Sequence, residues 1–262
     1  MVATDVIKNK IQNSIKGNSP YEVKDYGKMI RSRLGILVLD SINTEISTES
    51  INVMTATELI HTASLFHDDV IDNDKIRRLP HIGNKTAVIY GDLMLTNAIN
   101  ILLGINNPKI LSIYNNAIKN MCNGELFQQM FAGKIPTLKQ YIEKTELKTA
   151  SLFVAEINAL LILANADNNL KKNLIEFARL YGIAFQIKND LKDTQKEQKD
   201  LKQKIYTAPY VLTNSTVLTE SAIEKTARLL DNYIEKAEKC LMILKDSNFK
   251  ETLIGETECL RK

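Results

Sequence analysis

Apolar positions in this chain recur mostly at spacings of three and four residues. Such spacing gathers apolar side chains on one face of an α-helix, and no alternating pattern typical of a β-strand persists. The 5 prolines and 10 glycines punctuate the periodic stretches, with breaks at Asn107-Pro108 and Ile135-Pro136. The pattern predicts an all-α fold of about ten helices. They are expected at residues 3–16, 21–41, 49–73, 84–103, 108–131, 137–165, 168–194, 206–213, 219–245 and 248–260.

The stretch from residue 57 to residue 74 divides most clearly into two faces. Read as a helix at about 100° per residue, it separates apolar from polar side chains. The apolar stripe holds Leu59, Ala63, Phe66 and Val70, and the opposite stripe holds His61, Ser64, Asp68 and Asp72. One face is therefore expected to pack in the core, and the other is available for chemistry.

Three aspartates, Asp68, Asp69 and Asp72, crowd the C-terminal end of this helix. Like charges one turn apart cost about 0.2–0.5 kcal/mol per pair, and the helix dipole is already negative at this end. Carboxylate oxygens without cysteine suit a hard cation such as Mg²⁺ that keeps some of its waters. Arg77 and Arg78 follow, and guanidinium groups bind phosphate bidentately. The stretch predicts a diphosphate site, with a solvated acidic helix end and a basic loop as the alternative.

Composition narrows the setting of the protein. The 262 residues are 44% hydrophobic, enough for a substantial core. The net charge of only +3 favours neither nucleic acid nor a membrane surface as a partner. Cys122, Cys240 and Cys259 lack CxxC spacing, which favours free thiols in a reducing compartment such as the cytoplasm. No apolar run approaches the roughly 20 residues of a membrane span, and the N-terminus has no apolar signal core, so no membrane insertion is expected.

A second acidic helix is expected further along the chain. Phe185 and Gln186 are followed there by Asn189, Asp190 and Asp193. Like the first acidic helix, it places a phenylalanine within about one turn of its acidic cluster. We expect two helices of the same design to face each other across a cavity, with metal ions between them.

Two pairs that each contain a lysine complete the candidate site residues. Lys28 and Arg31 are three residues apart and are expected on one helix face, a spacing that suits one anion. Lys148 and Thr149 place an ammonium and a hydroxyl side by side on another helix. Each pair by itself is also explained as ordinary solvated surface.

In their order and spacing, these motifs resemble those of the trans-isoprenyl diphosphate (polyprenyl) synthase family. The resemblance runs from Gly27 to Leu260-Arg261-Lys262 and looks nearest to the bacterial octaprenyl-type synthases that make quinone side chains. It implies the isoprenoid synthase fold, a single all-α domain over residues 1–262 around a large central cavity. It also implies two to three Mg²⁺ ions, isopentenyl diphosphate and an allylic diphosphate as substrates, and a homodimer.

The resemblance implies a role for each motif. Isopentenyl diphosphate would be bound by Lys28, Arg31, His61 and Arg78. The allylic diphosphate would be bound by Arg77, Lys148, Thr149 and Gln186. Mg²⁺ would be bound by Asp68, Asp69, Asp72, Asn189, Asp190 and Asp193. The catalytic residues would be Asp68, Asp69, Arg77 and Lys148.

Product length in this family depends on the residues four and five positions before the first aspartate, where a bulky aromatic stops growth early. Ser64 and Ala63 occupy these positions here, and both are small. A long product, from heptaprenyl to decaprenyl, is therefore expected, with farnesyl diphosphate as the primer.

The sequence departs from the family pattern in two places. Asn189 stands where the second acidic motif usually has its first aspartate, and an amide ligates Mg²⁺ without adding negative charge, so the third ion should bind more weakly. Lys204 is displaced by one position from the family's later lysine motif. Its assignment to that motif rests on this shifted spacing.

Three other functions fit parts of the sequence. An HD-type metal-dependent phosphohydrolase would use His61, His67 and Asp68, but it would explain neither the paired arginines nor the second acidic helix. A non-catalytic subunit of a two-component prenyl synthase would fit Asn189, although the intact first aspartate motif argues against it. A terpene cyclase would share the first acidic helix but would not need the second-substrate residues Lys28 and Arg31.

Overall fold

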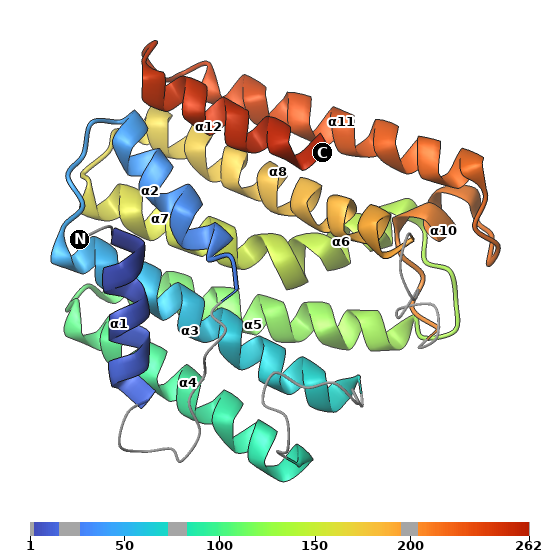
Figure 1. Cartoon of the computed structure of the whole chain (residues 1–262), viewed down its shortest axis with the longest axis horizontal. Coiled ribbons are helices and arrows are strands. Elements are labelled where there is room, and N and C mark those ends of the chain that lie inside the picture. Colours follow the sequence, from blue (N-terminus) through green and yellow to red (C-terminus); the bar gives the residue numbers. More distant parts are fainter. Residues whose placement is uncertain (1–2, 16–26, 73–82, 195–203, 262) are drawn as a thin grey trace. The chain divides into compact units, whose positions relative to one another are not determined.

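The computed structural model describes residues 3–15, 27–72, 83–194 and 204–261 (Figure 1). Every regular element within these ranges is a helix, which confirms the all-α prediction. The chain divides into two compact units. The first comprises Met1–Tyr114 and Ala159–Asn165, and the second comprises Asn115–Asn158 and Ala166–Lys262.

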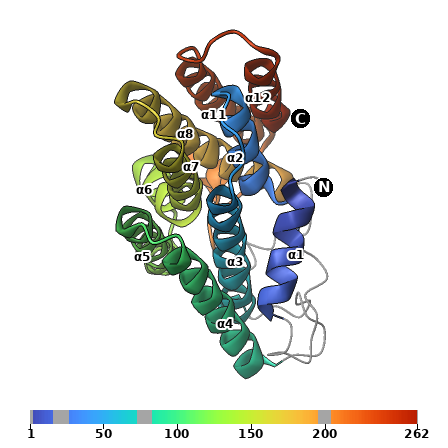
Figure 2. The same cartoon turned by 90° about the vertical axis from the view of Figure 1, so that its left-hand side faces the viewer.

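The first unit is built around one long helix. Its elements are α1 (Ala3–Ile15), α2 (Ile30–Ser41), α3 (Thr48–Ile71), α4 (Asn84–Gly104) and the start of α5 (Pro108–Met130). α3 lies along α4, and α1 and α2 also contact α3 (Figures 1 and 2). Leu59 and Phe66 are fully buried and Ala63 is 3% exposed, whereas His61 and Asp68 are half-buried. The apolar face predicted for α3 is therefore confirmed at three of its four positions, whereas Val70 is half-buried like the polar residues.

Polar and aromatic contacts hold α3 in place within this unit. The Ser47 hydroxyl caps its start by accepting the Ser50 N–H at 3.0 Å. The buried hydroxyls of Thr57 and Tyr114 share a hydrogen bond of 2.6 Å. Further along α3, the Phe66 ring stacks on Tyr90 of α4, with ring centroids 5.7 Å apart. The ring contact of Phe66 secures the helix close to its acidic end, because Phe66 lies only two residues before Asp68.

α4 combines a buried face with an exposed apolar one. It is the one helix in the described ranges that is long and apolar enough to cross a membrane by length and composition, a test that core helices of soluble proteins also pass. Ala87, Met94 and Ala98 are fully buried. On the other side, Ile89 and Leu103 are 66% and 54% exposed.

The second unit centres on α8 and α11, which pack along each other (Figure 1). Its elements are the remainder of α5, α6 (Leu138–Thr145), η1 (Glu146–Ala150), α7 (Ser151–Leu163) up to residue 158, α8 (Asn168–Asp193), α10 (Ala208–Thr213), α11 (Glu220–Leu241), α12 (Asn248–Glu258) and η2 (Cys259–Arg261). The buried residues of α11 recur every three or four positions, at Ala222, Thr226, Leu230, Ile234, Ala237 and Leu241. This stripe is the helical period that the sequence predicted.

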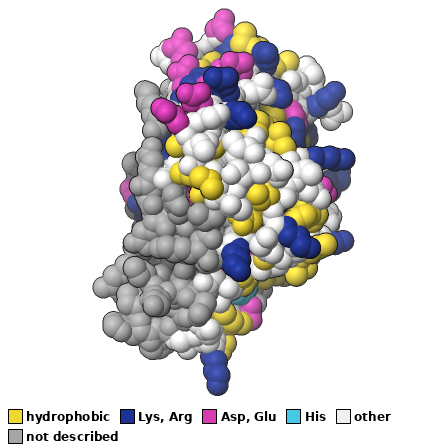
Figure 3. Space-filling view, turned by 90° about the vertical axis from the view of Figure 1, so that its right-hand side faces the viewer, with side chains coloured by type: hydrophobic (Ala, Val, Ile, Leu, Met, Phe, Trp, Pro, Cys, Tyr) yellow, Lys and Arg dark blue, Asp and Glu magenta, His cyan; other side chains and the backbone are white. Residues whose placement is uncertain are grey.

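The surface over α11 and α12 carries charges of both signs. These helices run along the top of Figure 1, and acidic and basic side chains are mixed at the top of the face in Figure 3. Arg261, for example, lies 3.2 Å from Asp231 and 3.1 Å from Glu238. Exposed pairs of this kind add at most about 1 kcal/mol each, so they contribute little to the stability of the fold.

Candidate functional site

The acidic end of α3 lies where the sequence places it. Asp68 and Asp69 belong to the last turn of the helix, and Asp72 is its C-cap residue. The backbone N–H of Asp72 donates to the carbonyl oxygen of Asp68 at 2.8 Å. All three side chains are half-buried. The three aspartates therefore lie at the negative end of the helix dipole, where a cation is favoured.

His67, beside this cluster, faces α4. Its Nε2 lies 3.2 Å from the Asp92 carboxylate. Its ring packs directly on Gly91, where a Cβ atom would come within 2.3 Å of the same nitrogen. His67 is therefore a half-buried histidine that faces a carboxylate of α4.

The basic pair near the start of the chain is not arranged as predicted. The helix expected over 21–41 begins only at Ile30 within the described residues. Gly27 and Met29 have φ angles of +61° and +48°, so the backbone turns here and Lys28 lies before the helix. Lys28 is exposed and Arg31 is buried. The two side chains do not share a helix face, because the left-handed residue Met29 separates Lys28 from the start of the helix.

Arg31 has a buried carboxylate partner, Glu58 of α3. The backbone N–H and the hydroxyl of Ser32 donate to Glu58 Oε1 at 3.1 and 2.8 Å. Burial raises the pKa of Glu58, and the charge of Arg31 and the hydrogen bonds from Ser32 offset this only in part. Met29, the N-cap residue of α2, makes no side-chain cap. Glu58 thus supplies from α3 the acceptor that the first turn of α2 lacks.

Lys148 and Thr149 lie in a π-helical turn. The single helix expected over 137–165 is interrupted at Glu146–Ala150, where the backbone widens to a π-helix. Two glycines border this turn. A Cβ on Gly124 of α5 would come within 2.6 Å of the backbone nitrogen of Lys148, and one on Gly182 of α8 would come within 2.7 Å of the Ala150 Cα. The wider turn fits because neither neighbouring helix carries a side chain there; such π turns are frequent at functional sites.

Glu125 of α5 is the counter-ion of Lys148. The Lys148 ammonium donates to the Glu125 carboxylate, and the side chains are only 15% (Glu125) and 28% (Lys148) exposed. Burial acts to raise the pKa of Glu125, but the charge and hydrogen bond of Lys148 outweigh it, and the pKa lies below its ordinary value. Gln129 also donates to this carboxylate, at 2.9 Å. Lys148 is therefore held in one place as a cation.

Hydrogen bonds join the π turn to α8. The hydroxyl of Thr149 donates to Gln186 Oε1 at 2.9 Å. The amide nitrogen of Gln186 in turn donates to Asp190 Oδ1 at 2.8 Å. The direction follows from chemistry, because an ionised carboxylate only accepts and so turns the Gln186 nitrogen toward itself. Three of the predicted site residues thus form one chain of contacts in the second unit.

Asp190 accepts two further hydrogen bonds through its other oxygen. The Tyr141 hydroxyl donates to Oδ2 at 2.6 Å, and the backbone N–H of Ala208 donates to it at 3.0 Å. The Asp190 side chain is 2% exposed. Burial, with the nearby Asp190 charge, raises the pKa of Tyr141 well above its ordinary value, so its hydroxyl remains a donor.

The predicted metal ligands differ in how they meet solvent. Asn189 is exposed and Asp193 is half-buried, unlike Asp190. Across the parts of the chain that the structure describes, no three carboxylate, imidazole or thiolate groups form a ready-made metal cluster. The half-buried oxygens of Asp68, Asp69 and Asp72 still suit Mg²⁺, which keeps several waters and takes its remaining ligands from substrate phosphates.

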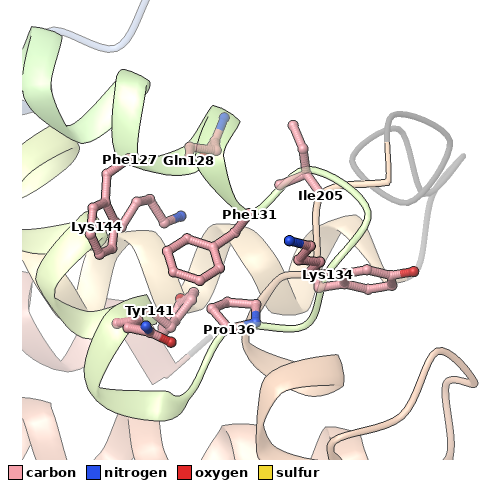
Figure 4. Close-up of a pocket in the computed structure, with 10 residues that line it drawn as sticks. Phe127, Gln128, Phe131, Lys134, Pro136, Tyr141, Lys144 and Ile205 are labelled. Carbon is pink, nitrogen blue, oxygen red and sulfur yellow. The ribbon is translucent and has the colours of Figure 1, made fainter.

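A small hollow opens near Tyr141 (Figure 4). Phe131 lies at its centre, beside Pro136 and Lys134, and Phe127 lines it with its ring centroid 5.2 Å from that of Phe131. The space that water centres can occupy in this open hollow is about 20 Å³, which is room for about one water molecule. The hollow is therefore too small for a prenyl diphosphate.

The other predicted residues fall in several settings. Arg77 and Arg78 lie outside the described residues. Ala63 is buried, and the half-buried Ser64 donates its hydroxyl proton to the carbonyl of His61 at 2.8 Å. Lys204 is exposed, with a φ angle of +59°, and its carbonyl accepts the N–H of Gly133 at 2.9 Å.

Three residues that support the site carried no assigned role in the sequence. Glu58, Glu125 and Tyr141 each bind a residue that did. Glu58 carries a signal, because helical spacing places this acid among buried positions and buried acids are almost always paired. Glu125 carries a weaker one, since its neighbours one helical turn away are half-buried or exposed. Tyr141 carries no such signal, because a tyrosine on a buried helix face is ordinary core.

Comparison with known proteins shows the family of this chain. The profile of the polyprenyl synthetase family matches residues 12–247. A decaprenyl-diphosphate synthase from Dictyostelium discoideum is 29% identical over 273 residues, covering 90% of this chain. This chain spans 60% of the length of that protein. A prenyl transferase from Cyanidium caldarium is 31% identical over 235 residues, which cover 84% of this chain and 72% of the relative.

A solved structure shows the same fold. The crystal structure of heptaprenyl diphosphate synthase from Staphylococcus aureus matches with a TM-score of 0.89 at 23% identity, covering 99% of this chain and 96% of the other. The helical arrangement is thus that of the isoprenoid synthases. The family profile spans far more than half of the sequence, and the chain therefore belongs to the polyprenyl synthetase family.

Proposed function

We propose that this chain is a Mg²⁺-dependent trans-prenyltransferase that joins an allylic diphosphate to successive molecules of isopentenyl diphosphate. The observation that carries the proposal is the hydrogen bond of 2.9 Å from Thr149 to Gln186. These residues come from two separate motifs, and the family resemblance assigns both to one ligand, the allylic diphosphate. Their direct contact supports the proposal because it brings both side chains within reach of one ligand.

The site residues take the roles that the resemblance implies. Lys148, Thr149, Gln186 and Arg77 bind the allylic diphosphate, and Lys28, Arg31, His61 and Arg78 bind isopentenyl diphosphate. Mg²⁺, when bound at the acidic residues, neutralises the diphosphate and stabilises it as a leaving group. The Lys148 ammonium, already held by Glu125, adds positive charge where negative charge develops.

The chemistry needs no protein nucleophile. The allylic C–O bond breaks with both electrons going to the diphosphate oxygen, which leaves a delocalised carbocation. The double bond of isopentenyl diphosphate supplies the electrons of the new C–C bond, and the released diphosphate accepts the proton that is then lost. The protein binds both substrates, orients them and excludes water from the cation.

We further propose a long all-trans product, octaprenyl within a range from heptaprenyl to decaprenyl, that serves as a quinone side chain. Ala63 and Ser64, the small residues before the first aspartate, support it, as do the names of the decaprenyl and heptaprenyl relatives. Residues 1–262 are proposed to form one polyprenyl synthase domain. The protein is proposed to act in the cytoplasm as a homodimer, without a nucleic-acid partner.

The test is elongation by the purified chain. It is incubated with Mg²⁺, farnesyl diphosphate and labelled isopentenyl diphosphate, and the dephosphorylated products are separated by chromatography. A ladder that ends at a long prenyl alcohol is expected, and it disappears when EDTA removes the metal. Release of phosphate without any elongation would contradict the proposal and favour a hydrolase.

A non-catalytic subunit of a two-component synthase is the second candidate. Asn189 favours it, because this exposed amide brings no negative charge to the second acidic motif. Such a subunit would bind diphosphate with Mg²⁺ and elongate nothing by itself. The HD-type hydrolase has less support, since Nε2 of His67 faces Asp92 at 3.2 Å.

A further inference from the structure

Asp190 belongs to the second acidic motif, yet its carboxylate is surrounded by protein donors. Oδ1 accepts from Gln186 at 2.8 Å. Oδ2 accepts from the Tyr141 hydroxyl at 2.6 Å and from the Ala208 N–H at 3.0 Å. An ionised carboxylate has about four acceptor positions. Three of them are occupied here by groups of the protein itself.

Burial strengthens this argument. The Asp190 side chain is 2% exposed, whereas Asn189 beside it is exposed and Asp193, one turn on, is half-buried. Mg²⁺ demands near-octahedral geometry and usually keeps several waters. Tyr141 and the start of α10 close Oδ2 to an ion, and the one acceptor position left, on Oδ1, is shut off from a hydrated ion by the burial of the residue. The ion meets no such obstacle at the exposed Asn189.

The contacts of Asp190 also explain how α10 begins. Thr207, the N-cap residue of α10, makes no side-chain cap. The first N–H of this short helix is bound instead by Asp190 of α8. An orphan N–H at a helix start requires such an acceptor when it is buried. Glu58 of α3 does the same for Ser32 of α2, so each unit uses a buried acid of a long helix to cap a neighbouring one.

We propose that Asp190 is a positioning residue and not a metal ligand. It fixes the Gln186 amide and, through it, the side chain of Thr149 at the place that receives the allylic diphosphate; this part rests on the proposed function. The metal-binding share of the second acidic motif then falls to Asn189 and Asp193, which together carry one negative charge. The second amide hydrogen of Gln186 is left to serve the diphosphate.

The test separates positioning from ligation with the full chain and five variants. Tyr141→Phe removes one donor to Asp190, and Asp190→Asn replaces an acceptor-only group by one that also donates. Asp193→Asn is the matched control, the same chemical change one turn away. The last two variants are Gln186→Ala and its combination with Asp190→Asn.

The first readout is thermal unfolding in EDTA without diphosphate. Asp190→Asn and Tyr141→Phe are expected to lower the midpoint by about 3–8 °C, because each disrupts a buried hydrogen bond to a charged acceptor. Asp193→Asn is expected to leave it unchanged. If Asp190→Asn did not lower the unfolding midpoint measured in EDTA, the positioning role would be overturned.

The second readout is calorimetric binding of inorganic pyrophosphate across a Mg²⁺ titration. Asp193→Asn is expected to raise the Mg²⁺ concentration for half-maximal binding several-fold. Asp190→Asn should leave that concentration unchanged while weakening pyrophosphate affinity about tenfold at saturating Mg²⁺, as the loss of one buried charged hydrogen bond predicts. If Asp190→Asn raised the Mg²⁺ concentration for half-maximal binding as much as Asp193→Asn does, Asp190 would be a metal ligand.

Gln186→Ala tests whether Asp190 affects pyrophosphate binding through Gln186 or through a general loosening of the fold. In the Asp190→Asn background it should cost little further affinity, because the two residues act through one contact. Fully additive losses would contradict the proposed chain from Asp190 to Thr149. Wild-type protein that binds no pyrophosphate at any Mg²⁺ concentration would overturn the proposed function and the diphosphate half of this inference, whereas the metal-free melting comparison tests the structural half independently.

Discussion

The Lys148 ammonium is bonded to the Glu125 carboxylate, which reaches it from α5. The two residues lie in the same unit, and the backbone of Lys148 rests on Gly124, the neighbour of its own counter-ion. α5 therefore secures both the main chain and the side chain of the residue proposed to hold the allylic diphosphate. Charge compensation within the protein lets this lysine stay ionised while it is half-buried.

Replacing Glu125 by Gln should destabilise the protein by about 1–2 kcal/mol, between the small value of an exposed pair and the larger cost of breaking a buried one. Urea unfolding at pH 7 measures the change. A double-mutant cycle with Lys148→Met should give a coupling energy of about 1 kcal/mol or more. Additive losses in that cycle would mean that the contact adds nothing to stability.

The stability that this pair contributes should depend on pH in a definite direction. Because the pKa of Glu125 is lower in the folded protein than its ordinary value of 4.5, folding favours the ionised form. The contribution is therefore complete above pH 4.5 and is lost as the pH falls through the folded pKa. The difference in unfolding free energy between wild type and Glu125→Gln should be constant from pH 7 to about 5 and narrow below 4.5. A difference that stays constant down to pH 3 would contradict the assignment.

The two glycines beside the π turn should not tolerate alanine. Gly124→Ala and Gly182→Ala place a Cβ within 2.6–2.7 Å of backbone atoms, and such overpacking costs about 1–3 kcal/mol. Gly255→Ala is the control, because nothing lies within 4 Å of its Cβ position in α12. There alanine should stabilise by up to about 1 kcal/mol. Equal effects at all three positions would mean that the π turn does not need its glycines.

Ala63→Tyr should shorten the product. Ala63 is 3% exposed on α3, so a ring at this position enters the interior and limits how far a growing chain extends. The product ladder from farnesyl diphosphate should end several isoprene units earlier, as chromatography of the prenyl alcohols would show. A melting curve serves as the folding control, and an unchanged ladder from folded protein would refute this account of chain length.

The exposed apolar side of α4 predicts self-association. Val88, Ile89, Ile99 and Leu103 are 37–66% exposed and share a sector of about 100° around the helix, an arrangement that marks protein contacts. Wild-type protein should sediment as a dimer, and Ile89→Asp should shift it toward the monomer. A monomeric wild-type chain at micromolar concentration would contradict the homodimer proposal.

Helical spacing alone predicted most elements of this fold. The limits of α3, α4 and α8 lie within a few residues of the expected ones, because the 3.6-residue period of buried positions follows directly from the order of apolar residues. The same period placed Leu59 and Phe66 inside and His61 and Asp68 on the other face. Motif order and spacing identified the family before any contact was known. The predicted start of α2 was wrong, because the positive φ of Met29 leaves no signal in the apolar pattern.

Contacts between distant segments decided the rest. The π turn exists where Gly124 and Gly182 leave room for it, and no local pattern in residues 146–150 reveals a neighbour's missing side chain. Asp190 and Asp193 look equivalent in the sequence, yet Tyr141, Gln186 and Ala208 surround only the first. The sequence by itself determined which residues bear charge and which helices carry them. Only the tertiary structure decided which charges meet protein donors and which are left for a ligand, because a carboxylate's role depends on the groups that folding brings within hydrogen-bond reach.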